Sequence, residues 1–232
     1  MLHLLWSVYD SVVHTTDIHL LLVGRSGTGK SHLAEQTKLL FRDPSSAKPM
    51  TADHVDHKMK QLRPTVGLNV IRVPALRPDG SVVLWDVGGH ASLRNIWRSY
   101  FASCAAIVFV VDSTASKDEF EEDALLLAAM MRALSLRRTP FLIVSNKIDV
   151  EGHMSLREVQ DRLRLVDIAA STADLAPPQN IASDSVSGFG GRVLRLMEVS
   201  ALRGDGVKEA MTWIAEQAVR FSQLGTLADT SD

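Results

Sequence analysis

The stretch GRSGTGKS, residues 24–31, decides how the rest of this chain folds. It fits the pattern G-x-x-x-x-G-K-[ST], whose glycines let the backbone close around an anion so that successive N–H groups converge on phosphates. Lys30 can place its charge on the β- and γ-phosphates, and the Ser31 hydroxyl can ligate Mg²⁺. Apolar residues 18–23 precede the stretch, and a helical pattern over residues 31–41 follows it. Strand, loop and helix in this order predict a nucleotide-phosphate site.

The composition of the chain narrows its class. At 232 residues it is long enough for one α/β domain with embellishments. A net charge of -2 with mixed signs gives no electrostatic case for binding nucleic acid. The single cysteine, Cys104, cannot form an internal disulfide, so we expect a cytoplasmic protein. We find no apolar run of the roughly 18 residues that a spanning helix needs, and no secretory signal pattern.

Strand and helix patterns alternate after the loop. Residues 68–75 and 81–85 read as a hairpin around the turn at residues 77–80. Apolar runs typical of parallel strands follow at residues 105–112 and 140–146, with a weaker one at 193–199. Helical patterns fill the gaps at residues 117–136, 155–165 and 206–224. The sequence therefore predicts a P-loop NTPase of α/β class, with a doubly wound, mostly parallel sheet of six strands and ligands at the strand carboxyl ends.

The expected organisation is a main domain with flanking segments. We expect the domain over residues 17–224, with insertions at about 42–63 and 171–191 and a flexible tail at 225–232. The first insertion carries two His–Asp pairs over residues 53–57. We read it as a solvated loop, because no third strong metal ligand follows at a suitable distance.

Residues 1–16 are predicted to form an N-terminal amphipathic helix. Its apolar face combines Leu2, Leu5, Trp6, Tyr9, Val12 and Val13. One alternative is a helix packed permanently on the domain, and the other is an interfacial membrane anchor. Anchoring by this segment alone would be marginal and reversible. Leu2 excludes N-myristoylation, so a second membrane signal is needed.

Polar motifs follow the predicted strands, where this architecture puts its ligand contacts. Asp86, in WDVGGH, can hold Mg²⁺ through a water, and Gly89 can offer its N–H to a γ-phosphate. Thr65, on the long segment before the hairpin, can supply a second hydroxyl to the metal. A terminal phosphate would thus order both segments, and its loss would release them.

The motif NKID, residues 146–149, selects the base. A carboxylate at Asp149 can accept hydrogen bonds from guanine N1–H and the exocyclic amine, and adenine has no matching pair of donors. The stem of Lys147 can pack over the purine, and Ser200 and the Ala201 N–H can brace it. We therefore expect GTP or GDP with Mg²⁺, the metal held by Ser31, Thr65 and, through water, Asp86. The expected nucleotide-binding residues are Gly24, Ser26, Gly27, Thr28, Gly29, Lys30, Ser31, His32, Thr65, Gly89, Asn146, Lys147, Asp149, Ser200, Ala201 and Leu202.

Further motifs make the chain resemble small GTPases of the Arf family over about residues 1–224. They are PTVGLNV at residues 64–70, WDVGG at 85–89 and WRSYF at 97–101. Within the family the chain is most similar to the Arf-related type of the trans-Golgi. That likeness rests on the N-terminal MLHLLWSVYD, on EQTK at residues 35–38, on the expanded loop before the hairpin, and on SAL followed by GDGV.

The resemblance implies a GTP/GDP switch that associates with the cytosolic face of Golgi membranes when GTP-bound and recruits effectors in vesicle trafficking. It implies an interswitch hairpin, about residues 68–85, that shifts register between nucleotide states and expels the N-terminal helix toward membrane. The implied partners are an exchange factor, an activating protein, a membrane-protein receptor for an acetylated N-terminus, and effectors on a surface of Leu68, Trp85 and Tyr100.

Three residues depart from the family pattern. His90 stands where most relatives carry the glutamine that orients the attacking water, although Sar-type GTPases also have histidine there and hydrolyse GTP. Ser26 replaces the usual aspartate, and Ser31 the usual threonine. We expect His90 to place the water and intrinsic hydrolysis to be slow. Two rival hypotheses are a GTP-binding trafficking scaffold without turnover and a P-loop small-molecule kinase.

Overall fold

The computed structural model describes residues 17–42, 59, 61–77, 80–136, 138–171, 186–189 and 192–229. The predicted N-terminal helix over residues 1–16 lies outside these ranges, and so does most of the predicted insertion at 42–63, including its His–Asp pairs.

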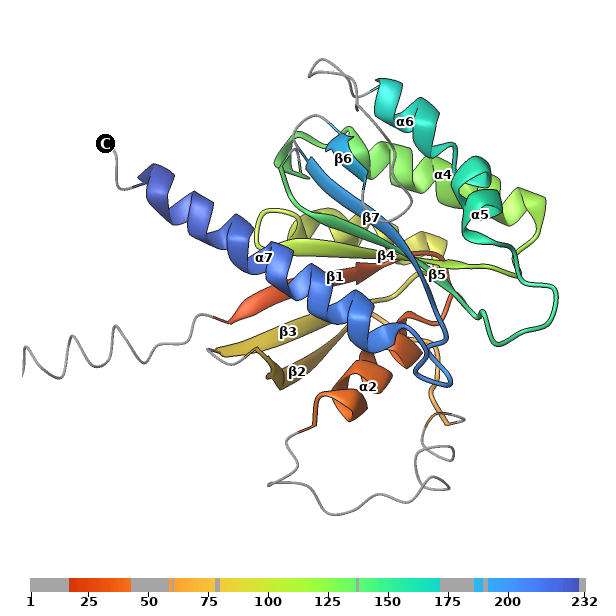
Figure 1. Ribbon diagram of the computed structural model, residues 1–232, viewed down its shortest axis with the longest axis horizontal. Coiled ribbons are helices and arrows are strands. Elements are labelled where there is room, and N and C mark those ends of the chain that lie inside the picture. Colours follow the sequence, from red (N-terminus) through yellow and green to blue (C-terminus); the bar gives the residue numbers. More distant parts are fainter. Residues whose placement is uncertain are drawn as a thin grey trace, which may run out of the picture.

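One mixed sheet forms the centre of the molecule (Figure 1). Among the described residues it has seven strands in the order β2-β3-β1-β4-β5-β7-β6. Neighbouring strands from β3 to β7 are parallel, and β2 and β6 pair antiparallel at the two edges. The strands are β1 Ile18–Val23, β2 Leu68–Arg77, β3 Gly80–Val87, β4 Ala106–Asp112, β5 Phe141–Asn146, β6 Val186–Phe189 and β7 Arg192–Val199.

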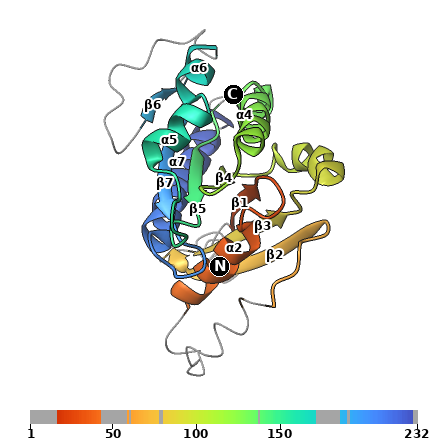
Figure 2. The same cartoon turned by 90° about the vertical axis from the view of Figure 1, so that its right-hand side faces the viewer.

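Helices cover both faces of the sheet (Figures 1 and 2). The helices α2 and α7 pack on one face, and η1, α4, α5 and α6 pack on the other. The helices are α2 Lys30–Leu40, α4 Lys117–Met131, α5 Leu156–Arg162, α6 Leu165–Ser171 and α7 Val207–Asp229, and the 3₁₀ segments are η1 Ala91–Tyr100 and η2 Leu134–Leu136. In the described part of the chain, no helix is both long enough and apolar enough to cross a bilayer.

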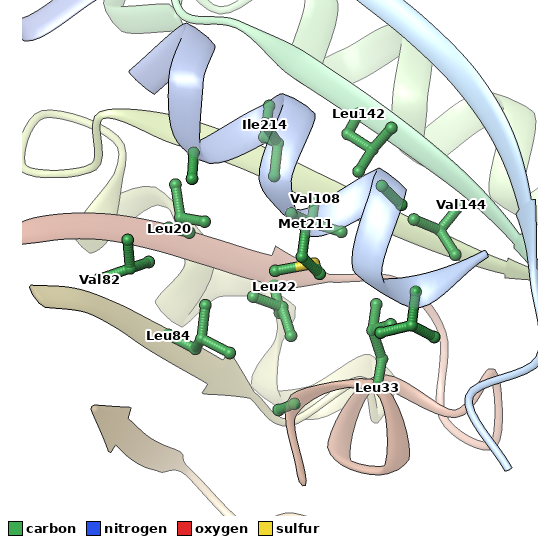
Figure 3. Close-up of a cluster of buried hydrophobic side chains, with 14 of the residues drawn as sticks. Leu20, Leu22, Leu33, Val82, Leu84, Val108, Leu142, Val144, Met211 and Ile214 are labelled. Atoms are coloured by element: carbon green, nitrogen blue, oxygen red, sulfur yellow. The ribbon is translucent and has the colours of Figure 1, made fainter. Parts of the chain in front are cut away.

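The central strand β1 supplies side chains to two cores. Leu20 and Leu22 point toward α2 and α7, where Met211 is also buried (Figure 3). Leu21 and Val23 join the opposite cluster under α4. This alternation is the period of a strand, and apart from the half-buried His19 it buries β1 on both faces. The phosphate loop that follows β1 is therefore anchored at one end in the core of the protein.

The fold class predicted from the sequence is confirmed, and the predicted elements differ from the structure in detail. The short strand β6 lies inside the segment 171–191 that the sequence predicted as an insertion, because its backbone pairs with the edge of β7. The predicted helix at 155–165 is two helices, divided at Arg164, whose φ of 53° belongs to the left-handed region. The last helix continues to Asp229, so most of the predicted tail is helical.

Candidate functional site

The phosphate loop follows β1 at the carboxyl edge of the sheet, and two of its glycines have no room for a side chain. Gly24 has φ 142°, and a Cβ on it would lie 2.2 Å from the Val110 carbonyl oxygen of β4. Gly29 has φ 92°, and its Cβ would lie 2.1 Å from Asn146 Nδ2. The glycine spacing that the sequence linked to phosphate binding is thus also required for packing against the neighbouring strand ends.

Lys30, the first residue of α2, folds back over the loop. Its Nζ donates to the carbonyl oxygens of Gly24 at 2.8 Å and Arg25 at 2.7 Å. Burial lowers the pKa of Lys30 to about 8, although the carboxylate of Asp86 acts in the opposite direction. An anion bound at the loop would favour the charged amine, as expected of a phosphate site.

Three side-chain oxygens converge next to Lys30. The Ser31 and Thr65 hydroxyl oxygens are 2.8 Å apart, and Thr65 donates to Asp86 Oδ2 at 3.0 Å. Asp86 is fully buried, and burial raises the pKa of its carboxyl. Its Oδ1 has no hydrogen-bond partner in the part of the chain that the structure describes. Hydroxyl and carboxylate oxygens of this kind fit Mg²⁺ as a hard cation.

The segment after β3 lies directly against the phosphate loop. A Cβ on Gly89 would be 2.4 Å from the Gly24 oxygen and 2.5 Å from Lys30 Nζ. A Cβ on Gly88 would be 2.7 Å from the Thr65 oxygen, and the Gly88 oxygen accepts from Trp97 Nε1 at 3.1 Å. Only a glycine pair permits this approach, so the loop, the Thr65 segment and the Gly88–Gly89 pair meet at one point.

A cavity of about 630 Å³ opens where these segments meet. His90, exposed at its rim, approaches Ser92 Oγ through Nδ1 at 2.8 Å and so sits at the start of η1. The cavity is lined by Ser26, Gly27, Gly29, Lys30, Ser31, His32, Leu62, Arg63, Pro64, Thr65, Val66, Gly89, His90, Ser92 and Leu93. Most of the predicted phosphate, metal and water-placing residues therefore lie together at this cavity, whereas Gly24, Thr28 and Asp86 do not line it.

The remaining predicted residues form a second group after β5 and β7. Asn146 links the two groups, because its Nδ2 donates to the Thr28 oxygen at 2.8 Å and its Oδ1 accepts from the Ala201 N–H at 2.9 Å. The Ser200 hydroxyl donates to Asp149 Oδ1 at 2.6 Å. The Ser200 hydroxyl and the Ala201 N–H, predicted to brace the base, thus contact Asp149 and Asn146 of the NKID motif. Their role toward the base stays a prediction.

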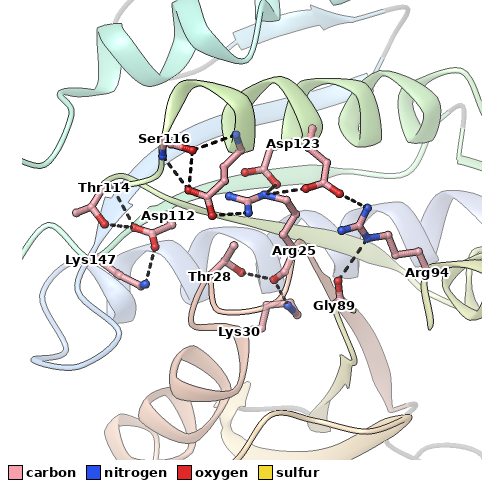
Figure 4. A network of polar contacts seen from close by, with 12 residues as sticks. Arg25, Thr28, Lys30, Gly89, Arg94, Asp112, Thr114, Ser116, Asp123 and Lys147 are labelled. Atoms are coloured by element: carbon pink, nitrogen blue, oxygen red, sulfur yellow. Dashed lines mark hydrogen bonds and ion pairs between the residues drawn. The ribbon is translucent and has the colours of Figure 1, made fainter. Parts of the chain in front are cut away.

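Lys147 has a partner that the sequence analysis missed. Its φ of 73° turns the chain after β5, and its Nζ pairs with Asp112 at the end of β4 (Figure 4). Asp112 could have been found from its position, since it ends an apolar strand at the same sheet edge. Leu202, the last of the predicted base-bracing residues, is exposed at the surface.

The predicted effector residues lie on β2, β3 and the end of η1. The Trp85 and Tyr100 rings are 5.3 Å apart, and Leu68 is exposed at the start of β2. His19 was not among the predicted residues, and its ring stacks on Trp85 with the two ring centroids 4.4 Å apart. Burial lowers the pKa of His19, so this stack is formed by a neutral imidazole at neutral pH.

Comparison with known proteins identifies the family of the chain. The profile of the ADP-ribosylation factor family matches residues 5–218. ADP-ribosylation factor-like protein 3 of Saccharomyces cerevisiae is 27% identical over 92% of this chain and 92% of its own. ADP-ribosylation factor-related protein 1 of Bos taurus is 27% identical over 95% and 94%. The Arl6 BBS3 small GTPase from Trypanosoma brucei, solved with the nucleotide analogue GppNp, has a TM-score of 0.65 at 23% identity, covering 88% of this chain and 99% of its own.

Replacing Asn146 with alanine should destabilise the nucleotide-free protein. The change leaves the buried Thr28 carbonyl and Ala201 N–H without their partners, at about 1–3 kcal/mol each, so we expect a loss of about 2–6 kcal/mol in unfolding free energy. Denaturant unfolding measures it. Asn95→Ala, on exposed η1, is the matched control and should change stability by less than about 0.5 kcal/mol. Equal stability of the two variants would contradict the bridging role of Asn146.

Proposed function

Because this chain belongs to the ADP-ribosylation factor family of small GTPases, we propose that it is a switch operated by GTP and GDP. In the GTP form it associates with the cytosolic face of Golgi membranes and recruits effectors for vesicle traffic. Hydrolysis of GTP to GDP and phosphate returns it to the cytoplasm.

One observation carries this proposal. The Thr65 hydroxyl lies 2.8 Å from Ser31 Oγ and 3.0 Å from Asp86 Oδ2, so the segment before the hairpin meets the phosphate loop and β3 at one point. A γ-phosphate with Mg²⁺ at this point would hold the Thr65 segment and Gly89 together. Loss of the γ-phosphate would remove the contacts that hold the Thr65 segment and Gly89 at this point.

We assign the phosphates to the loop N–H groups, to Lys30 and to the N–H of Gly89. Ser31 and Thr65 would hold Mg²⁺ directly and Asp86 through a water, which gives the unpartnered Asp86 oxygen a role. The metal, when bound, neutralises charge that builds on the phosphates during transfer. The cavity of about 630 Å³ has the size of a small-molecule site and provides the room for this end of the nucleotide.

Asp149 supports guanine over adenine. Its carboxylate is held by the Ser200 hydroxyl at 2.6 Å, which fixes one oxygen and orients the other. A positioned carboxylate accepts from two guanine donors and repels the acceptor that adenine presents at N1. This argument favours a GTPase over the P-loop kinase that the glycine loop alone would permit.

The partners follow from the family and from the surface of the hairpin. We propose that an exchange factor, an activating protein and effectors bind the segments of Thr65 and Gly89. Effectors would also contact Leu68, Trp85 and Tyr100. Residues 1–16 would form the membrane helix, with a membrane-protein receptor as the second signal, and residues 17–224 the nucleotide-binding domain with its two insertions.

Replacing Asp149 with asparagine tests base recognition. The variant loses two hydrogen bonds to a charged acceptor, each worth about 1.5–3 kcal/mol, so affinities for GTP and GDP should both fall by about 10²-fold or more. Titration with fluorescent nucleotides measures them. Asp161→Asn, exposed on α5, should bind like the native protein. Unchanged GTP affinity in Asp149→Asn, or tight ATP binding by the native protein, would favour the kinase.

Hydrolysis distinguishes a switch from a scaffold. In single-turnover assays the native protein should release phosphate slowly, and faster with an activating protein. His90→Ala should lower the intrinsic rate by about 10²-fold with GTP affinity unchanged, because the ring positions water rather than phosphate. His153→Ala, outside the cavity, is the control. No phosphate release with or without an activating protein would favour the scaffold.

Deleting residues 1–14 should abolish membrane association. Co-sedimentation with liposomes compares protein loaded with a non-hydrolysable GTP analogue and with GDP, using natively processed N-termini. Only the GTP-analogue form of the full chain should sediment, because the apolar face of the helix supplies the contact area. Leu125→Ser, an exposed leucine on α4, should sediment like the native chain. Binding by the truncated protein would refute the anchor.

A further inference from the structure

The phosphate loop carries a buried arginine whose side chain points away from the nucleotide site. Arg25 is the second residue of the loop, and its carbonyl oxygen accepts from Lys30 Nζ at 2.7 Å and Thr28 Oγ1 at 3.1 Å. Its side chain, only 8% exposed, runs instead to the first turns of α4 (Figure 4). The backbone of Arg25 therefore belongs to the nucleotide site and its guanidinium to a different cluster.

The cluster consists of three carboxylates on one edge of α4. Arg25 Nη1 donates to Glu119 Oε1 at 3.0 Å, and its Nε lies 3.0 Å from Asp123 Oδ1 and 3.9 Å from Glu122 Oε2. The Asp123 side chain is completely buried, and burial raises the pKa of its carboxyl to about 6 even beside the guanidinium. Arg25 is the compensating charge nearest to this carboxylate, and without it Asp123 would need another partner.

A second arginine connects the cluster to the segment that senses the γ-phosphate. Glu122 Oε1 receives Arg94 Nη1 at 2.6 Å, and Arg94 Nε donates to the Gly89 oxygen at 3.3 Å. Arg94 also acts on the ionisation of Asp123, after Arg25 and Glu122. Glu122 and Asp123 are therefore both negative groups near Arg94, and the observed pair with Glu122 goes together with the Arg94 contact to the Gly89 oxygen.

We propose that Arg25 is a positioning residue for Gly89. By pairing with Asp123 and Glu119, it leaves Glu122 as the partner of Arg94, so that Arg94 stays on the Gly89 carbonyl and the Gly89 N–H keeps its place over the phosphate loop. The inference rests on the proposed GTP-sensing role of Gly89. It adds a residue whose side chain contacts neither nucleotide nor metal.

The test is a double-mutant cycle between Arg25→Leu and Arg94→Leu, read as the ratio of affinities for a non-hydrolysable GTP analogue and GDP. Because only the analogue carries a γ-phosphate, Arg25→Leu should weaken analogue binding about tenfold and change GDP affinity by less than about twofold.

The Arg25→Leu/Arg94→Leu double variant should bind the analogue no more weakly than Arg94→Leu alone, since Arg25 acts through Arg94. Arg25→Leu with Asp123→Leu should recover most of the loss, because it removes the competing carboxylate and keeps Glu122. Arg157→Leu, exposed on α5, is the control.

A second measurement, by NMR, does not need nucleotide. Trp97 Nε1 donates to the Gly88 oxygen at 3.1 Å, so the indole N–H resonance of Trp97, assigned with Trp97→Phe, reports where the Gly88–Gly89 pair lies. Arg25→Leu should shift this resonance in nucleotide-free protein, and the double change with Asp123→Leu should restore it. If native protein binds neither nucleotide, the proposed function fails while the shift still supports positioning. Equal losses for analogue and GDP, additive effects in the cycle, or an unmoved Trp97 resonance would each overturn the inference.

Discussion

The side-chain amide of Asn146 is the contact on which the geometry of the whole site depends. It donates to the Thr28 carbonyl and accepts from the Ala201 N–H, so the loops after β1, β5 and β7 are joined by one buried group. Buried hydrogen bonds of this kind are strong because water does not compete for them. Gly29 is required underneath, since a Cβ there would lie 2.1 Å from Asn146 Nδ2. The distance between the phosphate loop and the loop that carries Asp149 is thereby fixed without any ligand.

At the phosphate end of the site, the Thr65 segment is held by hydrogen bonds that are less buried than those of Asn146. Thr65 lies in an irregular segment, and it meets the rest of the site through hydroxyl contacts to Ser31 and Asp86. Asp86 is a buried carboxylate with one oxygen that no described residue satisfies. A buried charge without full compensation is costly, so a cation and an anion bound here would change the free energy of this end more than that of the base end. A rigid base end beside a ligand-dependent phosphate end is the arrangement that a nucleotide switch needs.

The sequence predicted the fold and the two ends of the site because both depend on local rules. Parallel strands bring their carboxyl ends to one edge, so motifs such as NKID and WDVGG had to meet there. The sequence did not show that the Ala201 N–H is bonded to the Asn146 side chain, because this contact joins loops that are far apart in the chain. It also missed the break at Arg164, which depends on a single left-handed residue, and β6, which exists only through pairing with β7. The ion pair of Arg25 with Asp123 joins residues far apart in the chain and has no local signature.

The position of Arg25 shows that the fixed and the variable positions of a motif determine different properties of a site. In G-x-x-x-x-G-K-[ST] this position is free, because its carbonyl, which any residue provides, receives Lys30 Nζ. The side chain can therefore change without loss of the phosphate cradle. A buried guanidinium, however, must be compensated, and here the acidic edge of α4 does so through Glu119 and Asp123. It follows that position 25 is not independently variable. A leucine there would leave the buried Asp123 carboxylate without this partner, so positions 25 and 123 should change together. The motif thus fixes the chemistry of the site, and the positions it leaves free determine how that site is coupled to the helix beside it.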